Sequence, residues 1–100
     1  MDAVQRLLSV EYRVFGRVQG VFFRKYTKEK ADQLGIFGWV KNERDGTVSG
    51  LMQGTEAKID NMKHWLSHKG SPLSRIDKCE FTNEKVLDQL DLTSFIIKRG

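Results

Sequence analysis

The N-terminal third of the chain changes its hydrophobic period at a short glycine-containing loop. Residues 7–15 carry apolar side chains at every even position from 8 to 14, with mostly polar ones between them. This period of two predicts a strand with one buried face. After Gly16–Gly20 the period becomes helical, with an apolar face made of Phe23, Thr27, Ala31 and Leu34. Gly35 follows and is the usual residue for ending a helix.

The rest of the chain continues this exchange of strand and helix patterns. Residues 36–41 and 47–53 predict two strands, and Asp45-Gly46 between them is a typical hairpin turn. A second helix is expected to start after Thr55, a residue type that caps helices, and to end at Gly70-Ser71-Pro72. Residues 76–81 and 93–98 predict two further strands, whereas the polar residues 83–92 favour neither element.

The predicted order is β-α-β-β-α-β with an extra C-terminal strand. Both helices have to bury an apolar stripe, and the face of one sheet is the available surface. We therefore expect an α+β, ferredoxin-like sandwich with a mostly antiparallel sheet and two helices on one face. In that topology the first and second strands are parallel, with the third strand between them.

Composition narrows the class of protein. The chain has 100 residues, 39% of them hydrophobic, which fits one domain over residues 1–100. The absence of an 18-residue apolar run and of an N-terminal apolar segment predicts no membrane span and no secretory signal. Cys79 is the single cysteine, so an internal disulfide is impossible and a cytoplasmic location is expected. The net charge of 17 − 13 = +4 is modest and spread among acids, which favours a solvated surface over a nucleic-acid footprint.

The loop before the first helix is the candidate anion site. Glycines at 16 and 20 let the backbone turn and approach a ligand, and successive amides there can form an anion nest beside a helix N-terminus. Arg24, in the first helical turn, can reach over that nest with a guanidinium that suits phosphate. The alternative is a plain strand-to-helix turn with a solvated Arg24, since a lone GxxxG spacing is weak.

Asn42 is the second candidate. It lies where the second strand enters its hairpin, where asparagine is also a common turn former. Because the first and second strands are parallel, their C-terminal ends lie at one edge of the sheet. Asn42 is then placed to face Gly20 and Arg24 and to orient a water toward a bound phosphate.

Taken together, five ordered blocks between Val10 and Phe95 resemble the acylphosphatase family. The blocks are Gly16-x-Val18-Gln19-Gly20-Val21-x-Phe23-Arg24, Gly38-Trp39-Val40-x-Asn42, Asp45-Gly46-Thr47-Val48-x-Gly50, Gln53-Gly54 and Gly70-Ser71-Pro72. The resemblance implies hydrolysis of the carboxyl-phosphate bond of acyl phosphates, with Arg24 binding phosphate and Asn42 orienting the water. It also implies a backbone phosphate cradle, made of Gly16, Arg17, Val18, Gln19, Gly20, Val21 and Phe22.

The same resemblance implies a stand-alone, monomeric enzyme with a small-molecule acyl phosphate as substrate. Inorganic phosphate would be its product and competitive inhibitor, and no metal, organic cofactor, nucleic acid or membrane would be needed. Three features depart from the family pattern. Leu92 and Ser94 stand where the family often has tyrosine and asparagine before Phe95. Glu43 puts a carboxylate beside Asn42, and the chain ends Lys98-Arg99-Gly100 without the aromatic residue often found there.

Two other classes share this fold and are kept as alternatives. An RNA-binding module would need stacking aromatics on the third strand, and residues 47–54 contain none. A non-catalytic anion-binding domain would not require both Arg24 and Asn42. His64 and His68 have metal-ligand spacing without a third ligand nearby in sequence, and we expect them to be solvated. Cys79 is expected to be an inert, partly buried thiol.

Overall fold

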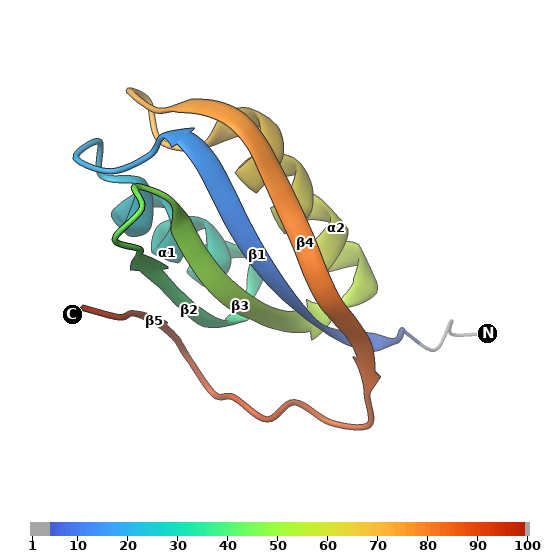
Figure 1. Cartoon of the computed structure of the whole chain (residues 1–100). Helices are drawn as coiled ribbons and strands as arrows, with labels where there is room; N and C mark the ends of the chain where they lie inside the picture. The colour runs from blue at the N-terminus through green and yellow to red at the C-terminus, as the bar shows by residue number, and fades with distance from the viewer. Residues whose placement is uncertain (1–4, 100) are drawn as a thin grey trace.

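The computed structural model describes residues 5–99 and contains five strands and two helices. The elements are β1 (Leu7–Arg17), α1 (Phe23–Leu34), β2 (Phe37–Asn42), β3 (Val48–Thr55), α2 (Glu56–His64), the π-helical turn η1 (Trp65–Lys69), β4 (Arg75–Leu87) and β5 (Phe95–Ile97). Figure 1 shows this order from the N-terminal strand to the C-terminal one. The predicted α+β order with an extra C-terminal strand is confirmed.

The five strands form one sheet in the order β4-β1-β3-β2-β5. Neighbours are antiparallel except β2 and β5, which are parallel. Since β1 and β2 run in the same direction on either side of β3, both end at the same edge of the sheet (Figure 1). This topology brings the loop after β1 close to the end of β2.

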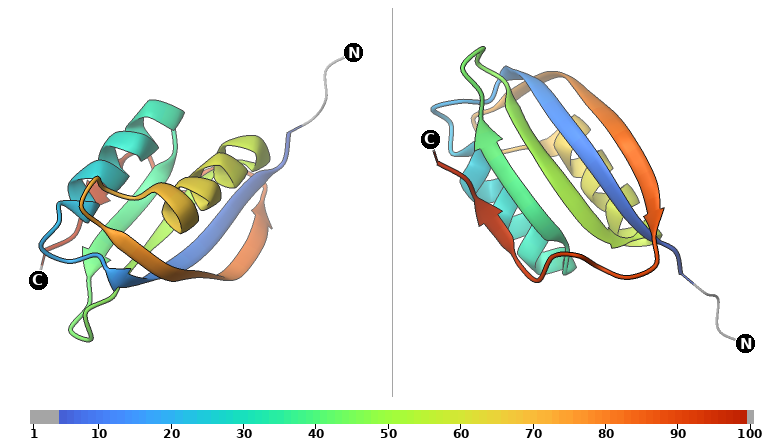
Figure 2. Two further views of the ribbon diagram at one scale, coloured as in Figure 1. Left: turned by 90° about the horizontal axis from the view of Figure 1, so that it is seen from above. Right: turned by 60° about the horizontal axis from the view of Figure 1, so that its bottom comes forward.

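Both helices cover one face of the sheet and leave the other face open (Figure 2). The core lies between the two layers, where the sheet contributes Val10, Val14, Val40, Val48 and Met52 and the helices contribute Phe23, Ala31, Ile59 and Met62. Each of these side chains is at most 1% exposed. The apolar periodicity read from the sequence therefore marks the surfaces that the sandwich buries.

Two strands are longer than the sequence pattern predicts. β1 continues to Arg17 because it stays paired with β4, where Gly16 and Arg17 lie opposite Ile76 and Arg75. Gly16 is needed there because a Cβ atom would meet the Arg75 carbonyl, and its φ of 130° disfavours other residues. β4 reaches Leu87 through polar residues because an exposed edge strand needs no apolar alternation to keep its ladder.

α2 starts at Glu56, directly after Thr55, as the sequence predicts. Thr55 is the N-cap residue, but its side chain makes no capping hydrogen bond and its Oγ1 is buried without a partner. The Glu56 amide instead donates to the Arg6 carbonyl at 2.9 Å. The predicted stop holds, since the helical segment ends at Lys69 before Gly70. In the part of the chain that the structure describes, no helix is long and apolar enough to cross a membrane.

Candidate active site

A pocket of about 560 Å³ opens where the ends of β1 and β2 meet the start of α1. Its walls come from the loop after β1, the first turn of α1, the end of β2 and the chain around β5. The lining residues are Val18, Gly20, Phe22, Phe23, Arg24, Lys25, Asn42, Ile97 and Arg99. Three of them are cationic and none is acidic, so the pocket suits an anion.

The loop that forms one wall leaves its backbone donors free. Within residues 5–99, the amides of residues 18–22 donate to no protein acceptor. Gly20 (φ 75°) and Phe22 (φ 61°) both adopt left-handed backbone conformations. Phe22 is strained there by about 1–3 kcal/mol, and such strain is common at ligand-binding loops. Free amides in a turned loop form the kind of nest that holds an anion.

Arg24 is the second residue of α1 and lies half-buried against this loop. No carboxylate within residues 5–99 forms a salt bridge with it. The first turn of α1 contains no acidic residue, and its N-cap side chain makes no hydrogen bond. The guanidinium and the positive helix end therefore act on the same space without a competing protein anion.

Asn42 closes the opposite side of the pocket as the last residue of β2. Its Oδ1 atom is buried and has no hydrogen-bond partner. A buried acceptor without a donor costs about 1–3 kcal/mol, so such an atom signals a missing donor. An O–H group of a water or ligand in the pocket would supply one.

Gln19 fixes the loop to the β2–β3 hairpin. Its Nε2 donates to the Glu43 carbonyl at 2.7 Å and to the Thr47 carbonyl at 2.9 Å. These bonds join the loop that carries the free amides to the residue next to Asn42. The Gln19 side chain thus positions the two walls of the pocket relative to each other.

The carboxylate of Glu43 points away from the pocket. It accepts a short hydrogen bond from Ser49 and lies 3.7 Å from the Lys41 ammonium. Glu43 is also absent from the lining of the pocket. In this orientation the Glu43 carboxylate does not face an anion bound in the pocket.

The remaining sequence candidates fall in different places. Gly16 and Arg17 belong to β1 and line a separate hollow together with Arg75 and Asp77. Val21 is 3% exposed and packs in the core. Sequence reasoning missed Lys25, Ile97 and Arg99, although the period of two after Phe95 places 97 and 99 on one side of the chain.

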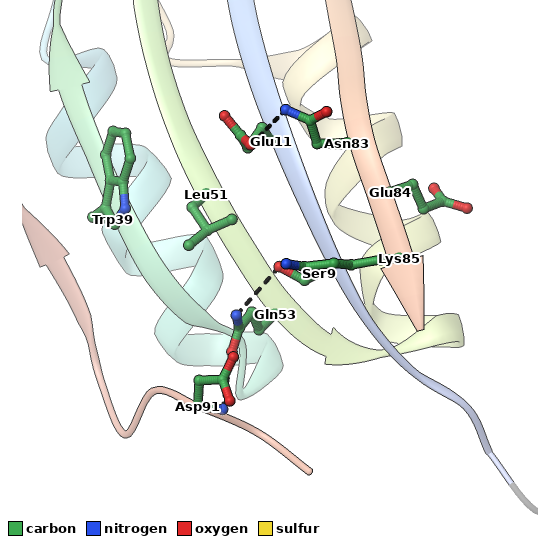
Figure 3. A pocket seen from close by; sticks show the side chains of 9 residues that line it. All are labelled: Ser9, Glu11, Trp39, Leu51, Gln53, Asn83, Glu84, Lys85 and Asp91. Carbon is green, nitrogen blue, oxygen red and sulfur yellow. Dashed lines mark hydrogen bonds between the residues drawn. The ribbon is translucent and has the colours of Figure 1, made fainter. Parts of the chain in front are cut away.

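A larger pocket of about 700 Å³ lies on the open face of the sheet (Figure 3). Trp39 and Leu51 form part of its floor, and Asp91 borders it from the β4–β5 connection. Gln53, 3% exposed, donates to Ser9 Oγ at 3.2 Å and accepts from the Asp91 amide at 3.2 Å. The buried polar groups of this larger pocket therefore bond to one another.

The other reactive side chains, Cys79, His64 and His68, are not among the residues that line the pocket at Arg24. Burial raises the pKa of the Cys79 thiol to about 12, which keeps it protonated near neutral pH. His64 and His68 are exposed on neighbouring turns, with ring centroids 4.9 Å apart. Among residues 5–99, no three His, Cys, Asp or Glu side chains cluster as metal ligands. Hydrogen bonds from Thr47 lower the pKa of Asp45, a residue that holds the hairpin turn.

Comparison with known proteins finds the same fold and sequence pattern. The acylphosphatase family model matches residues 10–97. The chain is 53% identical to human acylphosphatase-2 over 98 residues, covering 98% of this chain and 99% of the relative. It is 60% identical over 89 residues to acylphosphatase-2 of Meleagris gallopavo, covering 89% and 86%. The crystal structure of acylphosphatase from Bacillus subtilis superposes with a TM-score of 0.84 at 34% identity, covering 92% and 99%.

Proposed function

The chain belongs to the acylphosphatase family and is an enzyme acting on acyl phosphates, and from this premise we propose how its pocket hydrolyses the carboxyl-phosphate bond. Arg24 binds two phosphoryl oxygens through its guanidinium, and the amides of residues 18–22 cradle the remaining charge. Asn42 Oδ1 accepts a hydrogen bond from a water and aims that water at phosphorus. Arg24 and Asn42 are the catalytic residues in this scheme.

The proposed reaction needs few side chains because its leaving group is a stable carboxylate. The water oxygen bonds to phosphorus as the bond from phosphorus to the acyl oxygen breaks, and the electron pair leaves with the carboxylate. One proton of the water stays on the oxygen that is now bonded to phosphorus, and the other passes to a phosphoryl oxygen. The products are a carboxylate and inorganic phosphate. Positioning and charge stabilisation on the equatorial oxygens supply the catalysis.

The same proposal covers the partners of the reaction. Inorganic phosphate fills the cradle that holds the phosphoryl group and therefore inhibits competitively. All proposed groups come from one chain, so the enzyme works as a monomer of one domain, without a metal or organic cofactor. A single cysteine, with no second cysteine to form an internal disulfide, fits a cytoplasmic location.

The observation that carries the proposal is the buried, unpartnered Oδ1 of Asn42 in a pocket that also contains Arg24. The test is the hydrolysis of benzoyl phosphate in the presence of a metal chelator. We expect Asn42→Ala to lower kcat by about 100-fold or more, since one positioned polar contact in a transition state is commonly worth that much. The inhibition constant of inorganic phosphate should change little, because Arg24 and the amides remain.

Asn61→Ala is the matched control, because Asn61 is exposed on α2, away from the pocket. It should leave both kcat and phosphate inhibition unchanged. Full turnover in Asn42→Ala would overturn the water-orienting role. Loss of wild-type activity on adding the chelator would overturn the metal-independent mechanism.

A further inference from the structure

The pocket contains more positive charge than an acyl phosphate needs. Arg24, Lys25 and Arg99 line it together, and none of them forms a salt bridge with another residue within 5–99. The phosphoryl group of an acyl phosphate carries at most two negative charges, and Arg24 and the loop amides already face it in the proposed function. In the proposed function, Lys25 and Arg99 are therefore left for the acyl group.

Arg99 reaches the pocket through the pairing of β5 with β2. β5 runs parallel to β2, and the Lys98 amide extends this ladder by donating to the Val40 carbonyl at 2.8 Å. The chain after β5 thus runs to the end of the sheet where the loop after β1 and the start of α1 lie (Figures 1 and 2). Asn42 and Arg99 arrive there from adjacent parallel strands.

The alternation of side chains along β5 separates two neighbouring cations. Phe95 is buried under α1 and Ile97 lines the pocket, so Arg99 continues that face. Lys98 turns to the opposite face, where its Nζ lies 4.2 Å from the centre of the Trp39 ring. Only one of these two charges can meet a ligand in the pocket.

The lining of the pocket also has an apolar part. Ile97 and the Phe22 ring, whose residue is 68% exposed, line the pocket with the two extra cations. An acyl group with an apolar body and a negatively charged end would match this lining. Its body can contact Ile97 and Phe22 while its charged end binds Arg99. A guanidinium binds a carboxylate or phosphate with two parallel hydrogen bonds.

We infer that Arg99, assisted by Lys25, selects acyl phosphates whose acyl group carries a second anionic group, such as a carboxylate or another phosphate. This inference rests on the proposed function, because it assumes that the phosphoryl group occupies the cradle at Arg24. Arg99 is then a specificity-determining residue that binds the leaving group.

The test compares benzoyl phosphate with 4-carboxybenzoyl phosphate, which has the same ring and one additional carboxylate. The ratio of their kcat/KM values is measured for the wild type, Arg99→Gln and Lys98→Gln. Intrinsic differences in reactivity between the substrates are the same for every variant, so a change in the ratio reports the contact with the extra carboxylate. We expect Arg99→Gln to lower the ratio about fivefold, the size of a good solvent-accessible ion pair.

Lys98→Gln removes the same charge from the adjacent residue and should leave the ratio unchanged. Added salt should lower the wild-type ratio toward that of Arg99→Gln, because the contact is electrostatic. An unchanged ratio in Arg99→Gln, or an equal change in Lys98→Gln, would overturn the inference. Hydrolysis of neither substrate by the wild type would instead overturn the proposed function, and the inference with it.

Discussion

The pocket on the open face of the sheet and the pocket at the start of α1 differ in whether their polar groups already have partners. The pocket on the open face is larger, about 700 Å³ against 560 Å³, but its buried Gln53 bonds on both sides to Ser9 and Asp91. The pocket at the start of α1 keeps a buried Asn42 oxygen and a set of loop amides without protein partners. Volume alone therefore does not identify the site.

The charges of the lining residues also differ between the two pockets. Glu11, Glu84 and Asp91 accompany Lys85 around the larger pocket, so the charges there are mixed. The smaller pocket has three cations and no acid among its lining residues. The smaller pocket thus holds donors, an acceptor and like charges without protein partners, which supports the proposal that it is the functional site.

The largest effect is expected at Arg24. Arg24→Gln should lower kcat/KM for benzoyl phosphate by about 1,000-fold, because a preorganised guanidinium contributes several kcal/mol to a phosphoryl transition state. Competitive inhibition by inorganic phosphate should weaken in parallel. Arg44→Gln, at the exposed tip of the hairpin, is the control and should change neither quantity. Phosphate inhibition that is unchanged in Arg24→Gln would place the anion elsewhere.

A smaller effect on activity is expected at Gln19, which spans the two walls of the active pocket. Gln19→Leu removes the hydrogen bonds to the carbonyls of Glu43 and Thr47. We expect kcat to fall about tenfold as the loop and Asn42 lose their relative position, with a loss of about 1–2 kcal/mol in the free energy of unfolding. Steady-state assays and urea denaturation measure the two quantities. A stability loss with unchanged kcat would show that Gln19 is structural only.

The smallest effect on activity is expected at Gln53, the corresponding glutamine in the larger pocket. Gln53→Leu leaves buried Ser9 without its donor and frees the Asp91 amide. The free energy of unfolding should fall by about 1–3 kcal/mol, while kcat/KM for benzoyl phosphate stays within about twofold of the wild type.

The double variant Ser9→Ala/Gln53→Leu tests whether the stability loss comes from the buried hydrogen bond between these two residues. It removes both partners of the buried hydrogen bond, so its loss of stability should be smaller than the sum of the two single losses. A tenfold loss of activity in Gln53→Leu would show that the larger pocket also contributes to catalysis. The contrast between the two pockets would then fail.

The sequence by itself determined the order of elements, their buried faces and the candidates at the active pocket. Apolar periodicity located β1, α1 and the hairpin, and the spacing from Gly16 to Arg24 pointed to an anion site next to a helix start. These features can be predicted from the sequence because the periodicity of a strand or helix and the backbone freedom of glycine are set by residues only a few positions apart.

Only the tertiary structure decided which neighbours complete the site. β1 extends through Arg17 and β4 through Leu87 because the two strands pair with each other over their whole length, which polar edge residues do not reveal. Pairing of β5 with β2 brings Arg99 to the pocket, and the hairpin turns Glu43 toward Ser49. Such outcomes depend on contacts between residues that lie from 6 positions apart (Glu43 and Ser49) to 80 positions apart (Leu7 and Leu87), where the sequence carries no periodic signal.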